Sequence, residues 1–325
     1  MDFAGWLMPI HYKGIIDEHK AVRERVGIFD VSHMGQIFVG GSQAVEFLSY
    51  ITTWDMRRQN EGDCRYCHIL NDDGMIIDDV IVFSLSSEKF MVIPNASTVD
   101  KICDWMFIQS KNFDVDIHDS SSDYFCLALQ GPEASRLLGQ HLNTSISPFR
   151  LVKIGNTIIS GTGYTGEPGC EIIGLSGDAE NHWTSLIEMG AEPIGLGARD
   201  TLRLEKGYLL SGQDFAGGHN SLETGHNWVI DWNHDFIGRD SISKFRHSSY
   251  AKLSGVILED RGVLRPGLAV YHEGEKISTL TSGSMSPSIR RGIGLAYLDL
   301  PLDSLVTIDV RGNHLNGRVV RLPFL

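Results

Sequence analysis

The spacing of hydrophobic and polar positions in the first third of the chain predicts alternating helices and strands. Apolar residues recur at helical intervals from Ile15 to about Arg25 and from about Val99 to Gln109, and SQAVEFLSYIT predicts a further helix with Ser42 as its N-cap. Strands are expected where β-branched residues gather, in IFDVSHMGQIFVGG, RYCHIL, MIIDDVIVFSL and KFMVIPN. This order of elements indicates a mixed α+β unit.

The pattern changes from about Leu127 onward. CLALQGPEASRLLGQHL predicts a strand, a turn and a helix, with Pro132 near the first helical turn, and SGDAENHWTSLIEMGA predicts another helix. Between these segments, TIISGTGYTGEPGCEIIG is dense in glycine and has strand-like ends. From about Ala251 to Leu325 short strands alternate with Gly and Pro turns, which favours a small β-barrel or sandwich.

Length and charge narrow the class of protein. The chain of 325 residues is long enough for two or three domains with a real core. Its net charge of −13 argues against nucleic acid as a partner, because phosphate binding needs a basic footprint. No apolar run reaches membrane-spanning length, and the start, MDFAGWLMPI, lacks the basic and apolar regions of a signal peptide. We therefore expect a cytoplasmic protein that contacts neither nucleic acid nor membrane.

The cysteines indicate neither a disulfide framework nor a metal centre. There are five, an odd number scattered over the chain. Cys64 and Cys67 form a CxxC, but a single such pair without a second pair or clustered His is a weak metal signal. Both lie in GDCRYCHILN, which predicts a strand that enters the core. We expect buried structural thiols and no metal.

Two adjacent acids interrupt one of the predicted strands. Asp78 and Asp79 stand between Met75-Ile76-Ile77 and Val80-Ile81-Val82. Consecutive strand residues point to opposite faces, so one Asp faces water or a cap and the other faces the packed side or a cavity. A carboxylate that faces the packed side is costly unless it is neutralised or finds a partner. The pair is therefore a candidate for chemistry.

The glycine-dense segment GTGYTGEPGCEI is a second candidate, with Tyr164 and Glu171 among its glycines. Such density lets backbone approach a ligand closely, and a flat ring ligand would suit a Tyr face and a carboxylate. A pair of tight β-turns explains the same spacing. The segment fits neither a dinucleotide fingerprint nor a P-loop, which disfavours a phosphate cradle.

Two further segments hold residue types that occur in active sites. FDVSHM contains Asp30, Ser32 and His33, but Ser32 and His33 point to opposite faces of a strand and triad members normally come from separate segments. A serine hydrolase is therefore disfavoured, and we expect His33 to donate structural hydrogen bonds. In GLGARDTLRLEKG, Arg199 suits a bidentate carboxylate contact, or else a surface salt bridge with Glu205 or Asp200.

Taken together, the segments resemble the aminomethyltransferase family, the T-protein of the glycine cleavage system. The matching segments run nearly end to end in family order: DFAGWLMPIHY, GIFDVSHMGQIFVGG, GMIIDDVIV, LALQGPEA, GYTGEPGCEI, GLGARDTLRLEKGYLLSGQD, WNHDFIGRDSI and SGSMSPSIRRGIGLAYL. Each is weak alone, but their combination is specific. RYCHILN departs from the family pattern, because Cys67 and His68 stand where the family more often has small or apolar residues.

The resemblance implies a three-domain cloverleaf in which folate lies in the central hole. Two mixed α/β N-terminal domains would surround the folate cavity, followed by a small C-terminal β-barrel. The implied boundaries are 1–46 with 120–245 for the first folate-binding domain, 47–119 for an inserted α+β domain, and 246–325 for the barrel.

The resemblance also implies a transferase of glycine catabolism and one-carbon metabolism. It would take an aminomethyl group from the lipoyl arm of H-protein, pass the one-carbon unit to tetrahydrofolate as co-substrate, and release ammonia. Two alternatives stay open: another tetrahydrofolate-dependent methyl or methylene transferase on the same fold, and a non-catalytic folate-binding maintenance protein. Relatives of the second kind lack the paired acid and carry K-G-C-Y, where this chain has Lys206-Gly207-Tyr208.

Site residues follow from the resemblance position by position. Asp79 matches the catalytic aspartate, which leaves Asp78 as an outward acid that caps or is solvated. Glu171 and Arg199 match the main acid and base that contact folate. The residues that would line the pterin and aminobenzoate are Tyr66, Asn95, Tyr164 and Tyr208. A local basic rim for the folate tail and H-protein is expected from Lys13, Arg23, Arg25, Arg290 and Arg291.

Overall fold

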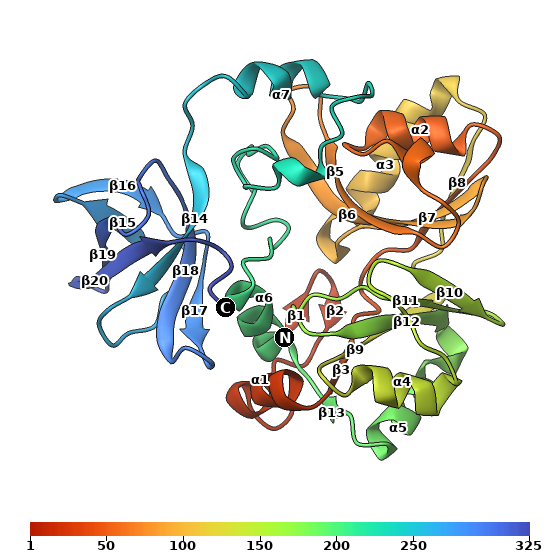
Figure 1. Cartoon of the computed structure of the whole chain (residues 1–325), viewed down its shortest axis with the longest axis horizontal. Helices are drawn as coiled ribbons and strands as arrows, with labels where there is room; N and C mark the ends of the chain where they lie inside the picture. The colour runs from red at the N-terminus through yellow and green to blue at the C-terminus, as the bar shows by residue number, and fades with distance from the viewer.

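A computed structural model describes residues 1–325 and contains three large sheets, of six, five and seven strands. Figure 1 shows them as three separate lobes around helix α6 (Leu196–Glu205) and the segment that follows it. The first two lobes mix helices and strands, and the last is built from strands alone. The predicted fold class, α+β with a separate C-terminal β unit, is confirmed. None of the helices has the length and hydropathy needed to span a membrane.

The six-stranded sheet has the order β10-β11-β12-β9-β3-β13. Its strands in chain order are β3 (Gly27–Asp30), β9 (Tyr124–Gln130), β10 (Leu151–Ile154), β11 (Thr157–Ser160), β12 (Gly169–Leu175) and β13 (Glu192–Pro193). Helices α4 (Ala134–Leu142) and α5 (Ala179–Glu188) cover one face, where Leu137, Leu138 and Leu186 are fully buried. Full burial of one such leucine side chain contributes about 1.5–3 kcal/mol to the stability of the folded chain.

The five-stranded sheet has the order β5-β6-β7-β4-β8. Its strands are β4 (Ile37–Gly40), β5 (Cys64–Leu70), β6 (Ile76–Ser86), β7 (Lys89–Ile93) and β8 (Asp116–Asp119). Helices α2 (Ala44–Ile51) and α3 (Val99–Gln109) cover one face, and the other face packs against the six-stranded sheet through Phe83, Leu85 and Met91. The expected domain boundaries stay a prediction. Strand β4 lies before residue 47, the expected start of the inserted domain, but belongs to this sheet.

Two local predictions in this region are wrong. IFDVSHMGQIFVGG is not one strand, since β3 and β4 lie in different sheets and a turn around Ser32 separates them. The Ser32 N–H donates to Asp30 Oδ1, which favours a turn over an extended strand. Ser42 does not cap α2, because its hydroxyl donates to Asp114 Oδ2 instead. The helices expected near Ile15 and Val99 are confirmed as α1 (Ile15–Glu24) and α3.

The seven-stranded sheet forms the C-terminal lobe, in the order β16-β15-β19-β20-β14-β18-β17. Its strands are β14 (Lys252–Leu258), β15 (Ala269–His272), β16 (Glu275–Thr279), β17 (Ser282–Ser286), β18 (Arg291–Leu298), β19 (Leu305–Val310) and β20 (Asn313–Val320). Figure 1 shows the sheet curling on itself. Its interior is apolar, with Val256, Ile308 and Val319 fully buried.

Helix α6 connects the lobes through two fully buried charged residues. Arg203 donates to Asp214 Oδ2 at 2.7 Å and to the hydroxyl of Ser282 on β17 at 2.7 Å. Glu205 accepts from Arg23 on α1 at 2.8 Å and from the hydroxyl of Ser286 on β17. The ion pair with Arg23 therefore fixes α6 against α1, and the hydrogen bonds with Ser282 and Ser286 fix α6 against the C-terminal lobe.

We expect that Arg203→Leu lowers the free energy of unfolding by about 3–5 kcal/mol, because Asp214 would remain as a buried charge without its cation. Urea titration measures the loss. Arg136→Leu is the matched control, since Arg136 pairs with Glu133 on the exposed surface and its loss should cost about 0–1 kcal/mol. Equal losses in the two variants would contradict the role of Arg203 as an anchor of α6.

Candidate active site

The two acids of β6 occupy different environments. Asp78 is fully buried, whereas Asp79 keeps part of its surface accessible. Asp78 accepts hydrogen bonds from the hydroxyls of Ser211 and Thr98, both at 2.6 Å, and from the backbone N–H of Asn95 at 2.9 Å. The prediction that Asp78 points outward into solvent is therefore wrong, whereas the capping alternative agrees with its bonds to Asn95 and Thr98, just before α3. Segments far away in the sequence cover its face of the strand and supply its donors.

Asp79 is held by two side chains that the sequence also predicted for the site. The Tyr66 hydroxyl on β5 donates to Asp79 Oδ2 at 2.8 Å. Asn95 Nδ2 lies 2.9 Å from Asp79 Oδ1 and 2.9 Å from Asp78 Oδ1. Asn95 thus bridges the two carboxylates, which explains how adjacent acids of opposite strand faces share one hydrogen-bond network.

The close approach of these acids keeps a proton near Asp79. Burial raises the pKa of Asp79 to about 7, and the negative charge of Asp78 acts in the same direction. Burial also raises the pKa of Asp78, but hydrogen bonds from Ser211 and Thr98 oppose that rise. Asp78 accepts more hydrogen bonds than Asp79 and is the better stabilised anion, so Asp79 is the member that changes its protonation state near neutral pH. A carboxyl group in that range can both donate and accept a proton.

Tyr164 connects this acid pair to the second half of the predicted site. It lies in the loop between β11 and β12, and its hydroxyl donates to the carbonyl oxygen of Leu209. Arg199 Cζ lies 4.6 Å from the centre of the Tyr164 ring. The centres of the Tyr164 and Tyr208 rings are 5.9 Å apart. Burial raises the pKa of Tyr164, with a further contribution from the negative charge of Asp79. Tyr208 is the outermost of the set, with 36% of its surface exposed.

Glu171 and Arg199 keep free hydrogen-bonding capacity in this region. Glu171, on β12, accepts one hydrogen bond, from the Thr162 hydroxyl, and burial raises its pKa. Arg199 forms no ion pair, and its neighbour Asp200 pairs with Arg203 instead. Burial lowers the pKa of Arg199. The prediction of a surface salt bridge is therefore wrong. An unpaired acid and base suit a ligand that offers N–H donors and a carboxylate or carbonyl.

The glycine-dense loop is packed around Gln130, a residue that the sequence analysis missed. Gln130 Nε2 donates to the carbonyl oxygens of Thr162 at 3.1 Å and Cys170 at 3.3 Å, and Gln130 Oε1 accepts from the Thr165 hydroxyl at 2.9 Å. A Cβ at Gly163 would clash with the Gln130 carboxamide. The close approach of the Gln130 side chain therefore requires a glycine at position 163. Nothing in the segment LALQGPEA indicates this contact.

The other candidate residues do not form a catalytic arrangement. His33 is buried with no partner for Nδ1, so it does not make the expected hydrogen bond there, and burial followed by the charge of Arg199 lowers its pKa to about 3. The Ser32 hydroxyl donates to the carbonyl oxygen of Cys126. Cys64 and Cys67 lie in different hydrophobic clusters, on opposite faces of β5, so they cannot chelate together.

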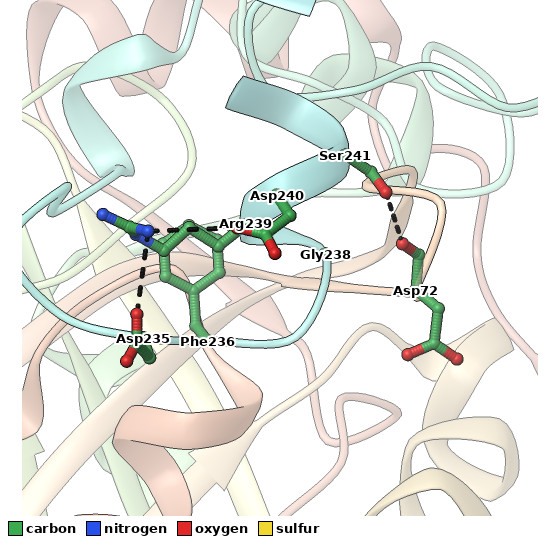
Figure 2. Close-up of a pocket in the computed structure, with 7 residues that line it drawn as sticks. All are labelled: Asp72, Asp235, Phe236, Gly238, Arg239, Asp240 and Ser241. Carbon is green, nitrogen blue, oxygen red and sulfur yellow. Dashed lines mark hydrogen bonds and ion pairs between the residues drawn. The ribbon is translucent and has the colours of Figure 1, made fainter. Parts of the chain in front are cut away.

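One surface recess of about 420 Å³ lies away from these residues, beside the start of α7 (Arg239–Phe245). Figure 2 shows its lining, in which the Ser241 hydroxyl donates to the carbonyl oxygen of Asp72 and Arg239 faces Asp235. Asp235 is almost fully exposed, and none of the seven predicted site residues lines this recess. Its carboxylates are solvated and do not constitute a second site.

Comparison with known proteins covers the whole chain. Residues 1–234 match the model "GCVT N-terminal domain" and residues 252–325 match "Glycine cleavage T-protein C-terminal barrel domain". An aminomethyltransferase of Halothermothrix orenii is 39% identical over 100% of this chain and 95% of its own length. One of Bacillus licheniformis is 36% identical over 100% and 94%. The crystal structure of glycine cleavage system aminomethyltransferase T from Bartonella henselae superposes with a TM-score of 0.95, at 30% identity and 100% and 93% coverage.

The acid pair predicts a pH-dependent stability difference for Asp79→Asn. The folded-state pKa of about 7 lies above the ordinary value of about 3.9, so the proton stabilises the folded chain at low pH and this contribution is lost as pH rises through 7. Asn cannot ionise, so the variant should become progressively more stable than the wild type between about pH 4 and pH 8. Thermal unfolding across this range measures the difference.

Asp240→Asn is the control, because Asp240 is almost fully exposed and its replacement should leave the pH dependence of unfolding unchanged. If the stability gap between Asp79→Asn and wild type were constant with pH, the pKa of Asp79 would not be raised in the folded chain.

Proposed function

The chain belongs to the glycine cleavage T-protein family and is an aminomethyltransferase, and we propose that it transfers the one-carbon unit at Asp79. The donor in this proposal is the aminomethyl group on the lipoyl arm of H-protein, the acceptor is tetrahydrofolate, and ammonia is released. The observation that carries the assignment is the acid pair bridged by Asn95, in a chain that matches aminomethyltransferases over its full length. A demethylase or a non-catalytic folate-binding role is not favoured.

Asp79 would move a proton in each direction during the transfer. The carbon–nitrogen bond to ammonia breaks, and the departing nitrogen needs a proton that protonated Asp79 can give. The bond from the carbon to the lipoyl sulfur breaks as well, and two new bonds join the carbon to two nitrogens of the folate. Each of these nitrogens gives up one proton: one replaces the proton that Asp79 gave to ammonia, and the other goes to the lipoyl sulfur, which leaves as a thiol. In its anionic form Asp79 also stabilises positive charge that develops on the carbon. A pKa of about 7 suits both roles.

Glu171 and Arg199 would orient the folate rather than react. The free oxygen of Glu171 can accept from the amino-pyrimidine edge of the pterin, and Arg199 can donate to oxygen atoms of the same molecule. Tyr66, Tyr164 and the more exposed Tyr208 offer aromatic faces along the way out of the site. Such positioning can contribute as much as acid–base chemistry.

The expected basic rim is weakened by the ion pairs of the structure. Lys13 and Arg25 both bind Glu192, and Arg23 donates to Glu167 and Glu205. Lys13, Arg25, Arg290 and Arg291 are all exposed, but of these four only Arg290 and Arg291 make no ion pair. Docking of H-protein through the predicted rim would therefore use mainly these two arginines, and its ionic-strength dependence should be modest.

We expect Asp79→Asn to retain the fold and to lower the rate of ammonia release from aminomethylated H-protein by ~10²–10⁴-fold in the presence of tetrahydrofolate. Asn keeps an oxygen for Asn95 but cannot carry the proton. Asp240→Asn, on the exposed start of α7, is the control for a lost carboxylate. Wild-type rates in Asp79→Asn would overturn the catalytic assignment.

Glu171→Gln should raise the KM for tetrahydrofolate about tenfold and leave kcat within about threefold, because a hydrogen bond to a charged group is lost in both ground and transition states. Gln retains the acceptor for the Thr162 hydroxyl, so the loop is conserved. Steady-state kinetics with varied folate separates the two constants. A fall in kcat at unchanged KM would place Glu171 in the chemical step instead.

A further inference from the structure

His68 is a buried polar residue directly beside the proposed catalytic acid. It lies on β5 and pairs in register with Asp79 on β6, the two strands being antiparallel neighbours. No part of its surface is accessible. A fully buried imidazole requires partners for both nitrogens, and this one has them.

Those partners form an unbroken line to Asp79. His68 Nδ1 lies 2.8 Å from the Ser221 hydroxyl, and His68 Nε2 lies 3.3 Å from the Tyr66 hydroxyl. The Tyr66 hydroxyl in turn donates to Asp79 Oδ2 at 2.8 Å. Tyr66 and His68 are two residues apart on one strand and therefore share a face, which makes the line continuous. Its order is Ser221, His68, Tyr66, Asp79.

The number of protons fixes the direction of each link. Tyr66 has one hydroxyl proton, and while Asp79 is an anion that proton is donated to it. His68 can then contact the Tyr66 oxygen only as a donor from Nε2, which leaves Nδ1 as the acceptor for the Ser221 hydroxyl. Protonation of Asp79 leaves this order intact, because the proton can occupy Oδ1 while Oδ2 still accepts from the Tyr66 hydroxyl. No proton then has to move within the line.

We propose that His68 is a positioning residue for the transfer reaction, which holds the Tyr66 hydroxyl on Asp79 in both protonation states of that acid. Ser221 completes the arrangement by donating to the far nitrogen, which fixes the orientation of the imidazole. The inference rests on the proposed role of Asp79. His68 touches neither substrate nor reacting atoms and acts through Tyr66.

The surroundings leave Asp79 as the titrating member of the line. Burial lowers the pKa of His68 well below its usual range, with His226 contributing, and burial raises the pKa of Tyr66 well above its own. Both therefore stay neutral at working pH. The charged and titratable groups near Asp79 are Asp78 on its own strand, Tyr66 and Cys67 on β5, and Tyr164 in the loop before β12. A change in the pH profile on altering His68 would report on Asp79.

His226 supplies a matched control. Its ring lies 6.2 Å from the Tyr66 ring and 5.9 Å from the His68 ring, so it belongs to the same aromatic cluster. Its Nδ1 contacts the carbonyl oxygen of Thr224, and it makes no hydrogen bond to the Tyr66 hydroxyl. A variant at His226 changes the packing around Tyr66 without touching the proposed line.

The decisive experiment is a double-variant cycle on the folate-dependent release of ammonia from aminomethylated H-protein, measured from pH 5.5 to 9. We expect His68→Leu to lower kcat about 3–10-fold, as the loss of one hydrogen bond predicts. It should also raise the apparent pKa of the acidic limb, because a loosened Tyr66 hydroxyl stabilises the Asp79 anion less. In a Tyr66→Phe background, His68→Leu should have no further effect.

Conservative and control variants sharpen the result. His68→Gln carries an N–H near the place of Nε2 and should restore most of the lost activity and the wild-type apparent pKa. His226→Leu should keep the wild-type apparent pKa. If His68→Leu fails to fold, as thermal unfolding would show, Ser221→Ala takes its place, with a smaller upward shift of the apparent pKa expected.

Two results would overturn the inference: an unchanged pH profile in His68→Leu, or in Ser221→Ala where it is the substitute, and an equal loss of activity with and without the Tyr66 hydroxyl. Either would make His68 a core residue only. Failure of the proposed function itself is distinguishable, because then Asp79→Asn would retain activity whatever the His68 variants did.

Discussion

The structure depends on keeping two carboxylates next to each other on one buried strand. Asp78 is stable as an anion only because Asn95, Thr98 and Ser211 all donate to it. These donors come from the turn after β7, the start of α3 and the segment after α6. Closing the network therefore brings separate parts of the chain together. It also leaves Asp79 with fewer donors, so the proton that the pair retains lies on the acid that remains accessible.

Helix α6 performs the corresponding task for the other half of the site. Near its end, Arg203 forms an ion pair with Asp214, and Glu205 forms an ion pair with Arg23. Arg199, one turn earlier, is left without an ion pair and faces Tyr164. Since a buried, unpaired guanidinium is costly, the helix must be fixed elsewhere to hold Arg199 in that position. The contacts that fix α6 to α1 and to β17 and the unpaired Arg199 are thus two consequences of one helix.

The sequence predicted the helices and strands better than it predicted the distant residues that pack against them. Helices α1 and α3 follow directly from periodicity, and the acid pair was correctly assigned to a strand. Period two shows that Asp78 and Asp79 face opposite ways, but which face is covered depends on residues such as Ser211, far away along the chain. For the same reason the sequence predicted Ser42 as a helix cap, although its hydroxyl binds the distant Asp114. The sequence also could not show that Gln130 supports a loop that lies more than thirty residues later in the chain.

The line from Ser221 to Asp79 illustrates why a site of this kind needs neutral groups around its acid. In the proposed reaction, a cationic partner would lower the pKa of Asp79 and remove the proton meant for the departing ammonia. An apolar wall would raise the pKa of Asp79 further. A hydroxyl that donates to the carboxyl group avoids both effects, but only if its orientation is fixed by a further contact. An imidazole held neutral by burial supplies a donor for Tyr66 and an acceptor for Ser221 at once. In the proposed mechanism, the acid could then change its charge during turnover without any link in the line losing its partner.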